Sequence, residues 1–244
     1  MSKIYQVSTL DALMQGYFNG SVTVKELLKH GSYGIGTFEG LDGEMIVQNG
    51  KVFDGRSDGN VYPMSDDELI AFTTVYDFTA NALKFTADDL KDLDAVKAYL
   101  DSIIEKNYNG NKNVFYIMNA EGVFDLAKVR SCSKQQAPYP TLAEVAKCQK
   151  ENTYSNEEGY LQAIWCPQYI NGINLPGWHI HYLSKDFKHG GHVLNLAIKS
   201  IALTFDQICS FDLNLPTNEA FGKVDLLEDL SSATASVEGD TGKK

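Results

Sequence analysis

The stretch that decides the fold is Gly177-Trp-His-Ile-His-Tyr-Leu-Ser-Lys-Asp-Phe-Lys-His-Gly-Gly-His-Val193. In a β-strand every second residue points to the same face, so His179 and His181 share one face. The polar residues that follow predict a loop, and two consecutive glycines permit a tight bend before a second apolar run. If the two runs pair as an antiparallel hairpin folded about the Asp186–Phe187 bond, His192 falls opposite His181.

Three imidazoles on one side of a ribbon are typical of a catalytic zinc site. Such a site binds the ion through three nitrogens at about 2.0–2.1 Å and leaves further positions open. The alternative is that His-x-His arises by chance on an exposed strand. The chain has five histidines, and the concentration of three of them in this ribbon favours the metal site. His30 ends an expected helix and His189 lies in the loop, so neither is assigned to the metal.

Composition disfavours several classes of function. The formal net charge of −11 opposes binding to nucleic acid, where Lys and Arg must neutralise phosphates, and to anionic membrane surfaces. No apolar run approaches the ~18 residues of a membrane span, and the first residues carry no apolar leader. The four scattered cysteines are typical of free thiols rather than of a disulfide framework. We therefore expect a cytoplasmic protein, with secretion after loss of a leader as the alternative.

The remaining pattern predicts an α+β fold: two mixed or antiparallel β-sheet parts with a few flanking helices. Asn49-Gly50 predicts a two-residue hairpin, because both residues tolerate positive φ. Period-two runs predict strands over 33–38, 44–47, 51–53, 69–78, 159–166 and 193–205.

Helix-start signals recur along the chain, each a Ser or Thr followed three residues later by an acidic residue. They predict short helices that begin near Ser8, Thr23 and Thr141, and a long one over Ala87–Lys106. The runs 114–119 and 123–129 are expected to form a hairpin around Ala120-Glu121-Gly122.

Three parts are expected along the chain. Residues 1–140 form an N-terminal part that carries Glu44 and Arg130, and residues 141–216 form a C-terminal part that carries the three histidines. Residues 217–244 are acidic and rich in small residues, a composition typical of a disordered end.

Arg130 is, with Arg56, one of only two arginines among 21 basic residues. Such sparing use is consistent with bidentate recognition of a carboxylate, which lysine cannot supply. Glu44 begins a strand after a turn, where an acidic residue is usually solvated, so the pattern alone assigns it no role. The sequence has no phosphate-binding loop, nucleophile elbow or Schiff-base motif, so no organic cofactor is indicated. If the reaction needs an electron sink, the metal would have to supply it.

Three motifs together resemble those of the α-acetolactate decarboxylase family. They are the histidine ribbon, Gly-Thr-Phe-Glu-Gly-Leu-Asp-Gly-Glu-Met (36–45) and Val-Arg-Ser … Pro-Tyr-Pro-Thr-Leu (129–142). They occur in the family's order, span nearly the whole chain and are highly specific in combination. Two departures are mild: Tyr182 stands where relatives often have Phe, and Cys132 follows Arg130-Ser131.

The resemblance implies decarboxylation of 2-acetolactate, a 2-hydroxy-3-keto acid, to acetoin and CO₂. A Zn²⁺ ion would act as a Lewis acid that stabilises an enediolate, which a carboxylic acid then protonates. The implied zinc ligands are His179, His181 and His192. The implied catalytic residues are Glu44, Arg130 and Glu238, the last in a tail that folds back toward the site. The implied substrate-binding residues are Thr37 and Arg130.

Other functions stay open at this point. Another zinc lyase or hydrolase can also use three sheet-borne histidines, and a cupin-like binding barrel carries a related motif. The glutamate usual in cupins after His-x-His is missing, since Ser184 and Lys185 stand there. The expected partner is a small molecule, without nucleic acid or membrane, and a homodimer is expected.

Overall fold

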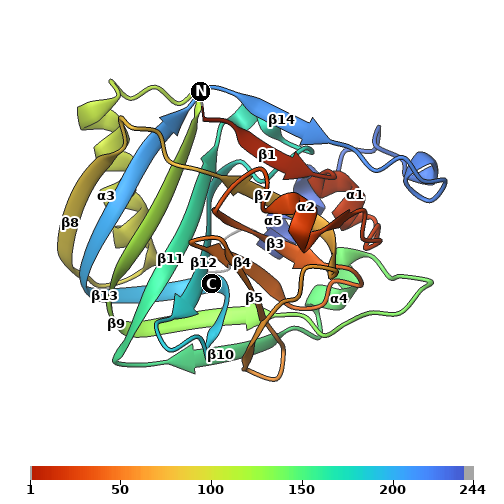
Figure 1. Cartoon of the computed structure of the whole chain (residues 1–244), viewed down its shortest axis with the longest axis horizontal. Helices are drawn as coiled ribbons and strands as arrows, with labels where there is room; N and C mark the ends of the chain where they lie inside the picture. Colours follow the sequence, from red (N-terminus) through yellow and green to blue (C-terminus); the bar gives the residue numbers. More distant parts are fainter. Residues whose placement is uncertain (1, 239–244) are drawn as a thin grey trace.

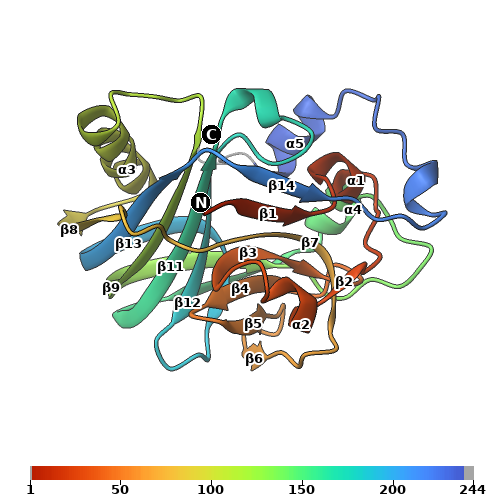
Figure 2. The ribbon, with the colours of Figure 1, turned by 45° about the horizontal axis from the view of Figure 1, so that its top comes forward.

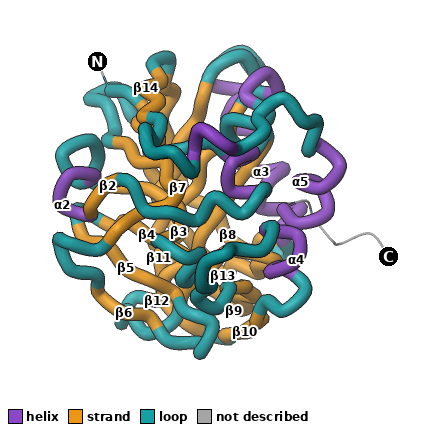
Figure 3. The backbone as a smooth tube through the Cα atoms, turned by 90° about the vertical axis from the view of Figure 1, so that its right-hand side faces the viewer, coloured by secondary structure: helices purple, strands orange, loops and turns teal. Residues whose placement is uncertain are grey.

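Two β-sheets form the centre of the protein, and helices lie around them (Figure 1, Figure 3). The structure is a computed structural model that describes residues 2–238, with the side chain of Glu238 excepted. The sheets and flanking helices confirm the predicted α+β fold.

The first sheet is mixed and runs in the order β14-β1-β7-β3-β4-β5-β6, with β2 paired to β7. Asn49 and Gly50 both have positive φ and join β4 to β5, as their tolerance of that conformation predicts. The strands are β1 (Ile4–Val7), β2 (Val22–Thr23), β3 (Tyr33–Phe38), β4 (Glu44–Gln48), β5 (Lys51–Gly55), β6 (Val61–Pro63), β7 (Leu69–Tyr76) and β14 (Phe211–Asn214).

The second sheet is antiparallel, in the order β10-β9-β11-β12-β13-β8. Because β9 also pairs with β13, the strands β9, β11, β12 and β13 close on themselves. The strands are β8 (Leu83–Leu90), β9 (Phe115–Ser131), β10 (Lys150–Tyr154), β11 (Glu157–Cys166), β12 (Gly177–Ser184) and β13 (Gly190–Ile208). The two sheets share an apolar layer in which Ile35 and Tyr76 of the first pack with Ile117 and Ile164 of the second.

Helix α2 lies beside β2 and β7, and the other helices lie in two further places, as Figure 2 shows. Helix α3 packs on the second sheet through its apolar stripe, whereas α1, α4 and α5 gather at the far side of the first sheet. Within residues 2–238 no helix is both long and apolar enough to cross a membrane. The helices are α1 (Leu10–Met14), α2 (Val24–Leu27), α3 (Leu93–Asn107), α4 (Leu142–Ala146) and α5 (Ser231–Glu238), with 3₁₀ turns η1 (Gln168–Ile170) and η2 (Phe221–Lys223).

The helix caps agree with the sequence for α2 and α4, whereas α1 is capped by Thr9, one residue after Ser8, and the long helix begins later than predicted. Thr23 and Thr141 are N-caps, and Thr141 forms a capping box with Glu144. The prediction of one helix over 87–106 is wrong at its start: residues 83–90 form β8, which pairs with β13, and Asp92 caps α3. The strand pairing overrides the local helix-start signal.

The predicted hairpin around Gly122 is also wrong. Residues 115–131 form one uninterrupted strand, β9. A Cβ atom on Gly122 would lie 2.1 Å from the carbonyl oxygen of Ser200 on β13. The glycine therefore marks a close approach between strands, which the sequence pattern does not distinguish from a turn.

The division into 1–140, 141–216 and 217–244 concerns folding units and stays a prediction. Strand pairing places β8 and β9, from the first of these ranges, in the second sheet. The second sheet is thus built from strands of both the first and the second predicted part.

Candidate metal centre

The histidine ribbon has the predicted register. β12 and β13 pair antiparallel with His181 directly opposite His192. The Nε2 atom of His179 lies 3.1 Å from Nε2 of His181 and 3.0 Å from Nδ1 of His192. A tetrahedral zinc ion with bonds of about 2.0–2.1 Å separates its ligand nitrogens by roughly 3.3 Å. Two of the three separations are close to this value and all three ligand atoms lie within 4.8 Å of one another, so the group could hold a single metal ion.

The protonation of these imidazoles also suits a metal. The Nδ1 atom of His181 lies 3.0 Å from the carbonyl oxygen of Met45, which can only accept, so Nδ1 carries the proton and Nε2 keeps its lone pair. Burial, together with neighbouring His179, lowers the pKa of His181 well below its ordinary value. Burial and the Arg130 guanidinium do the same to the pKa of His192. Neutral imidazole is the form that binds metal ions.

A cavity adjoins the three histidines, with about 510 Å³ of space counted out to its open mouth. The predicted site residues Thr37, Glu44, Arg130 and the three histidines all line it. The rest of its wall is largely apolar and consists of Leu10, Leu13, Gly36, Leu41, Phe72, Cys132, Leu142, Asn174 and Leu175.

Glu44 is the first residue of β4, and its side chain is only 15% exposed. Its Oε2 atom lies 3.6 Å from Nε2 of His181. Because that imidazole is neutral, the contact is not an ion pair; it places the carboxyl group beside the metal position. Thr37 donates a 2.8 Å hydrogen bond from its hydroxyl to the carbonyl oxygen of Gly43. Thr37 thus also fixes the turn that precedes Glu44.

Arg130 lies near the end of β9, where its backbone pairs with His192. The side chain is 3% exposed, and Nη1 donates a 3.1 Å hydrogen bond to the amide oxygen of Gln149. The strand pairing therefore brings a buried guanidinium next to the three-histidine group.

Glu238 is the last residue of α5, and its side chain lies outside the part that the structure describes. Helix α5 itself packs on α4, and Ala233 and Val237 join the apolar cluster that contains the cavity residues Leu13 and Leu142. The helix is consistent with a tail that folds back, whereas tail composition indicated disorder.

Sequence reasoning missed the apolar wall, Gln149 and Asn174. Asn174 is buried, and its amide nitrogen donates to Gln6 at 2.6 Å and to Thr74 at 3.0 Å. It comes from a short irregular loop, and only the tertiary structure brings it to the cavity. No spacing or motif in the sequence signals it.

Comparison with known proteins decides the family. The sequence profile described as "Alpha-acetolactate decarboxylase" matches residues 4–228. The chain belongs to the alpha-acetolactate decarboxylase family. It is 36% identical to the alpha-acetolactate decarboxylase of Methylococcus capsulatus over 231 residues, which cover 95% of this chain and 86% of that protein. It is 35% identical to that of Brevibacillus brevis, with 97% and 81% covered.

Solved structures show the same fold. The crystal structure of alpha-acetolactate decarboxylase from Bacillus subtilis matches with a TM-score of 0.90 at 28% identity, covering 98% of this chain and 99% of that one. A Staphylococcus aureus protein of unknown function, described as similar to alpha-acetolactate decarboxylase, matches with a TM-score of 0.89 at 29% identity, covering 96% and 99%.

Proposed function

We propose that the protein decarboxylates 2-acetolactate to acetoin and CO₂ at the three-histidine centre, with Zn²⁺ as its ion. The supporting observation is that three imidazoles, the Glu44 carboxyl group and the buried Arg130 meet in one cavity of a chain from this family. When bound, such an ion supplies a Lewis acid that stabilises the negative charge left on the substrate as CO₂ departs.

Arg130 binds and orients the substrate in this proposal. A guanidinium donates two parallel hydrogen bonds to a carboxylate, and the low exposure of Arg130 strengthens them by excluding water. The same fork can hold the substrate hydroxyl. The hydrogen bond to Gln149 keeps the guanidinium plane in one orientation.

A carboxylic acid returns the proton after CO₂ has left. Glu44 is the first candidate for this role, supported by its carboxyl group, which lines the cavity beside His181. Glu238 is the second candidate, supported by its place at the end of the helix that covers the cavity wall. Thr37 lines the cavity near Glu44 and is proposed to contact the substrate.

In this proposal the apolar wall of the cavity contacts the methyl groups of the substrate. Acetolactate carries two methyl groups, and Leu10, Leu142 and Phe72 offer them an apolar surface. A wall of this kind also keeps water away from the developing charge, which strengthens the electrostatic interactions inside the cavity.

The function is tested with three substrates and with metal removal. Protein with bound metal should form acetoin from 2-acetolactate but should not hydrolyse an ester or hydrate CO₂ at comparable rates. Chelation should abolish acetoin formation, and added Zn²⁺ should restore it. Turnover of the ester alone would indicate a zinc hydrolase, and binding without turnover of any substrate would indicate a binding domain.

Arg130→Lys should fold normally but decarboxylate poorly. Lysine keeps the charge but cannot reproduce the forked donor, so we expect kcat/KM to fall by roughly 10- to 100-fold, the effect of losing 1.4 to 2.7 kcal/mol of charge-assisted hydrogen bonding. Steady-state kinetics and circular dichroism measure the two properties. Lys128→Arg, at a half-exposed position on the same strand where the side chain pairs with Glu151, is the control. Wild-type kinetics in Arg130→Lys would remove Arg130 from the site.

The homodimer and the cytoplasmic location stay predictions. Light scattering of the purified protein tests the first, and fractionation of the source cells tests the second.

A further inference from the structure

One three-residue segment, Gly43 to Met45, performs several tasks in the site. The side chain of Glu44 faces the cavity, and the carbonyl oxygen of Met45 fixes the tautomer of His181. The carbonyl oxygen of Gly43 accepts a hydrogen bond from the hydroxyl group of Thr37. A small displacement of this segment therefore alters the proton donor and a metal ligand together.

Asp54 lies directly behind this segment. It sits on β5 opposite Met45 of β4, and its side chain is fully buried. Gly43 has a φ of +69°, and a Cβ atom there would lie 1.7 Å from Oδ1 of Asp54. The carboxylate thus occupies the space against the glycine, and no larger residue fits.

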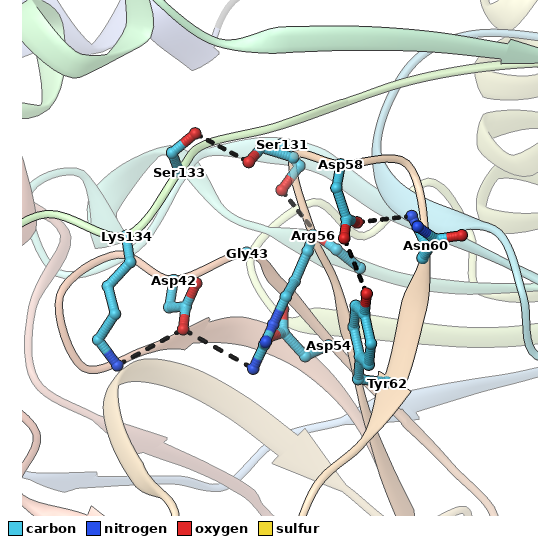
Figure 4. A network of polar contacts seen from close by, with 12 residues as sticks. Asp42, Gly43, Asp54, Arg56, Asp58, Asn60, Tyr62, Ser131, Ser133 and Lys134 are labelled. Carbon is cyan, nitrogen blue, oxygen red and sulfur yellow. Dashed lines mark hydrogen bonds and ion pairs between the residues drawn. The ribbon is translucent and has the colours of Figure 1, made fainter.

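Arg56 links Asp54 to the other side of the turn, as Figure 4 shows. Its Nε donates a 2.6 Å hydrogen bond to Oδ2 of Asp54, and its Nη2 lies 3.8 Å from Asp42. Lys134 lies 3.5 Å from the same Asp42 carboxylate. The guanidinium also covers the ring of Tyr62 at 4.7 Å. The turn before Glu44 is therefore held between two carboxylates that share one arginine.

Hydrogen bonds also link this turn and the end of β5 to the residues that follow Arg130. The backbone N–H of Gly43 donates to the carbonyl oxygen of Cys132 at 3.2 Å. The hydroxyl of Ser131 donates to the carbonyl oxygen of Gly55 at 2.7 Å. The residues directly after Arg130 are thus bonded to the turn on one side and to the end of β5 on the other.

We propose that Asp54, held by Arg56, is a positioning residue that fixes the turn before Glu44 and thereby places the Glu44 carboxyl group relative to the three histidines and Arg130. Asp54 is not among the residues that line the cavity, so it acts through Gly43 and not on the substrate. The inference rests on the proposed function in so far as Glu44 works in the reaction.

The energetics of Asp54 favour a role in the site over a role in stability. Burial raises its pKa to about 7, although Arg56 opposes the shift. Among the described residues, Oδ1 has no hydrogen-bond partner. Because the folded-state pKa lies above the ordinary value of 3.8, folding favours the protonated form, and stability falls as the pH rises from about 4 to about 7. At neutral pH the carboxylate therefore costs stability, and such costs concentrate at functional sites.

Asp54→Asn tests the proposal, because asparagine keeps the shape and removes the charge. We expect kcat to fall by roughly 10- to 100-fold, the range that a misplaced reacting group produces. In the metal-free protein we expect faster amide hydrogen exchange over residues 41–46. The unfolding temperature at pH 8 should equal or exceed that of the wild type. Asp58→Asn is the matched control, since exposed Asp58 belongs to the same network through Asn60 and Tyr62 without touching Gly43.

The outcomes separate the possibilities. The proposal would be overturned if Asp54→Asn kept the wild-type kcat and the wild-type rate of amide hydrogen exchange. It would also be overturned if the unfolding temperature at pH 8 fell in line with the loss of activity, because that result indicates a structural role for Asp54. If the variant does not fold, Arg56→Gln decides: faster exchange over 41–46 in a folded protein supports the proposal, and unchanged exchange overturns it. Failure of the wild type to act on acetolactate would remove the proposed function but leave the exchange result to judge the positioning.

Discussion

His181→Ala is expected to lose both the bound metal and acetoin formation. His181 has its Nε2 within 3.1 Å of the His179 nitrogen, and its tautomer is set by Met45. Two remaining imidazoles hold a catalytic ion poorly. Activity should fall by more than about 100-fold, since changes to the groups that merely orient metal-bound histidines already cost 10- to 100-fold. Elemental analysis after gel filtration measures the metal, and an acetoin assay measures turnover.

His189→Ala is the matched control for this variant. His189 lies in the loop of the same ribbon, bonds to Glu157 at 2.8 Å and stacks on Tyr154, but is not part of the three-histidine group. The His189→Ala variant should keep its bound metal and lose at most some of its free energy of unfolding. A full complement of metal in His181→Ala would refute the assignment of the centre.

The register of the ribbon was predictable because a two-residue period leaves little freedom once one face is fixed. A shift of one residue would turn His179 and His181 to the opposite face, so the pairing of His181 with His192 follows from the position of the loop. The errors at 87–90 and at Gly122 arise where a local signal competes with a distant strand. Both segments pair with β13, which lies about a hundred residues further along the chain in the first case.

The residues of the site also differ in whether a sequence pattern or only the tertiary structure identifies them. Spacing alone indicated the three histidines, and the rarity of arginine suggested Arg130, whereas Glu44 and Thr37 were assigned only through the resemblance to the family. Asp54 gave no signal, because an aspartate near a turn is usually solvated. Its burial depends on how β5 pairs with β4 and on where Arg56 lies. Asn174 and Gln149 reach the site only through tertiary packing.

The last prediction concerns helix α5, where composition and structure point in different directions. The tail from residue 217 is acidic and rich in small residues, yet Leu230, Ala233 and Val237 pack against the apolar cluster of α1 and α4. An eight-residue helix is too short to be stable alone, so this contact must hold it in place. Fixing each residue costs about 1–2 kcal/mol of backbone entropy, which the apolar contacts have to offset.

Deletion of all residues after Leu230 should therefore leave the sheets and the three-histidine centre intact while activity collapses. The deletion uncovers the outer side of the cavity wall formed by Leu13 and Leu142, and it removes Glu238. Glu238→Gln should reproduce most of the loss, about 100-fold or more if this residue supplies the proton. Circular dichroism, metal content and acetoin formation measure the three properties.

Two point variants separate the packing of α5 from the chemistry of its last residue. Val237→Asp places a charge in the apolar cluster and should release the helix, with much of the activity lost. Leu227→Asp is the matched control, because that side chain is 96% exposed and its charge stays in water. If Val237→Asp is as active as Leu227→Asp while Glu238→Gln is inactive, the glutamate acts without a docked helix. If the truncated protein forms acetoin at the full-length rate, neither the helix nor Glu238 takes part, and Glu44 is left as the acid that returns the proton.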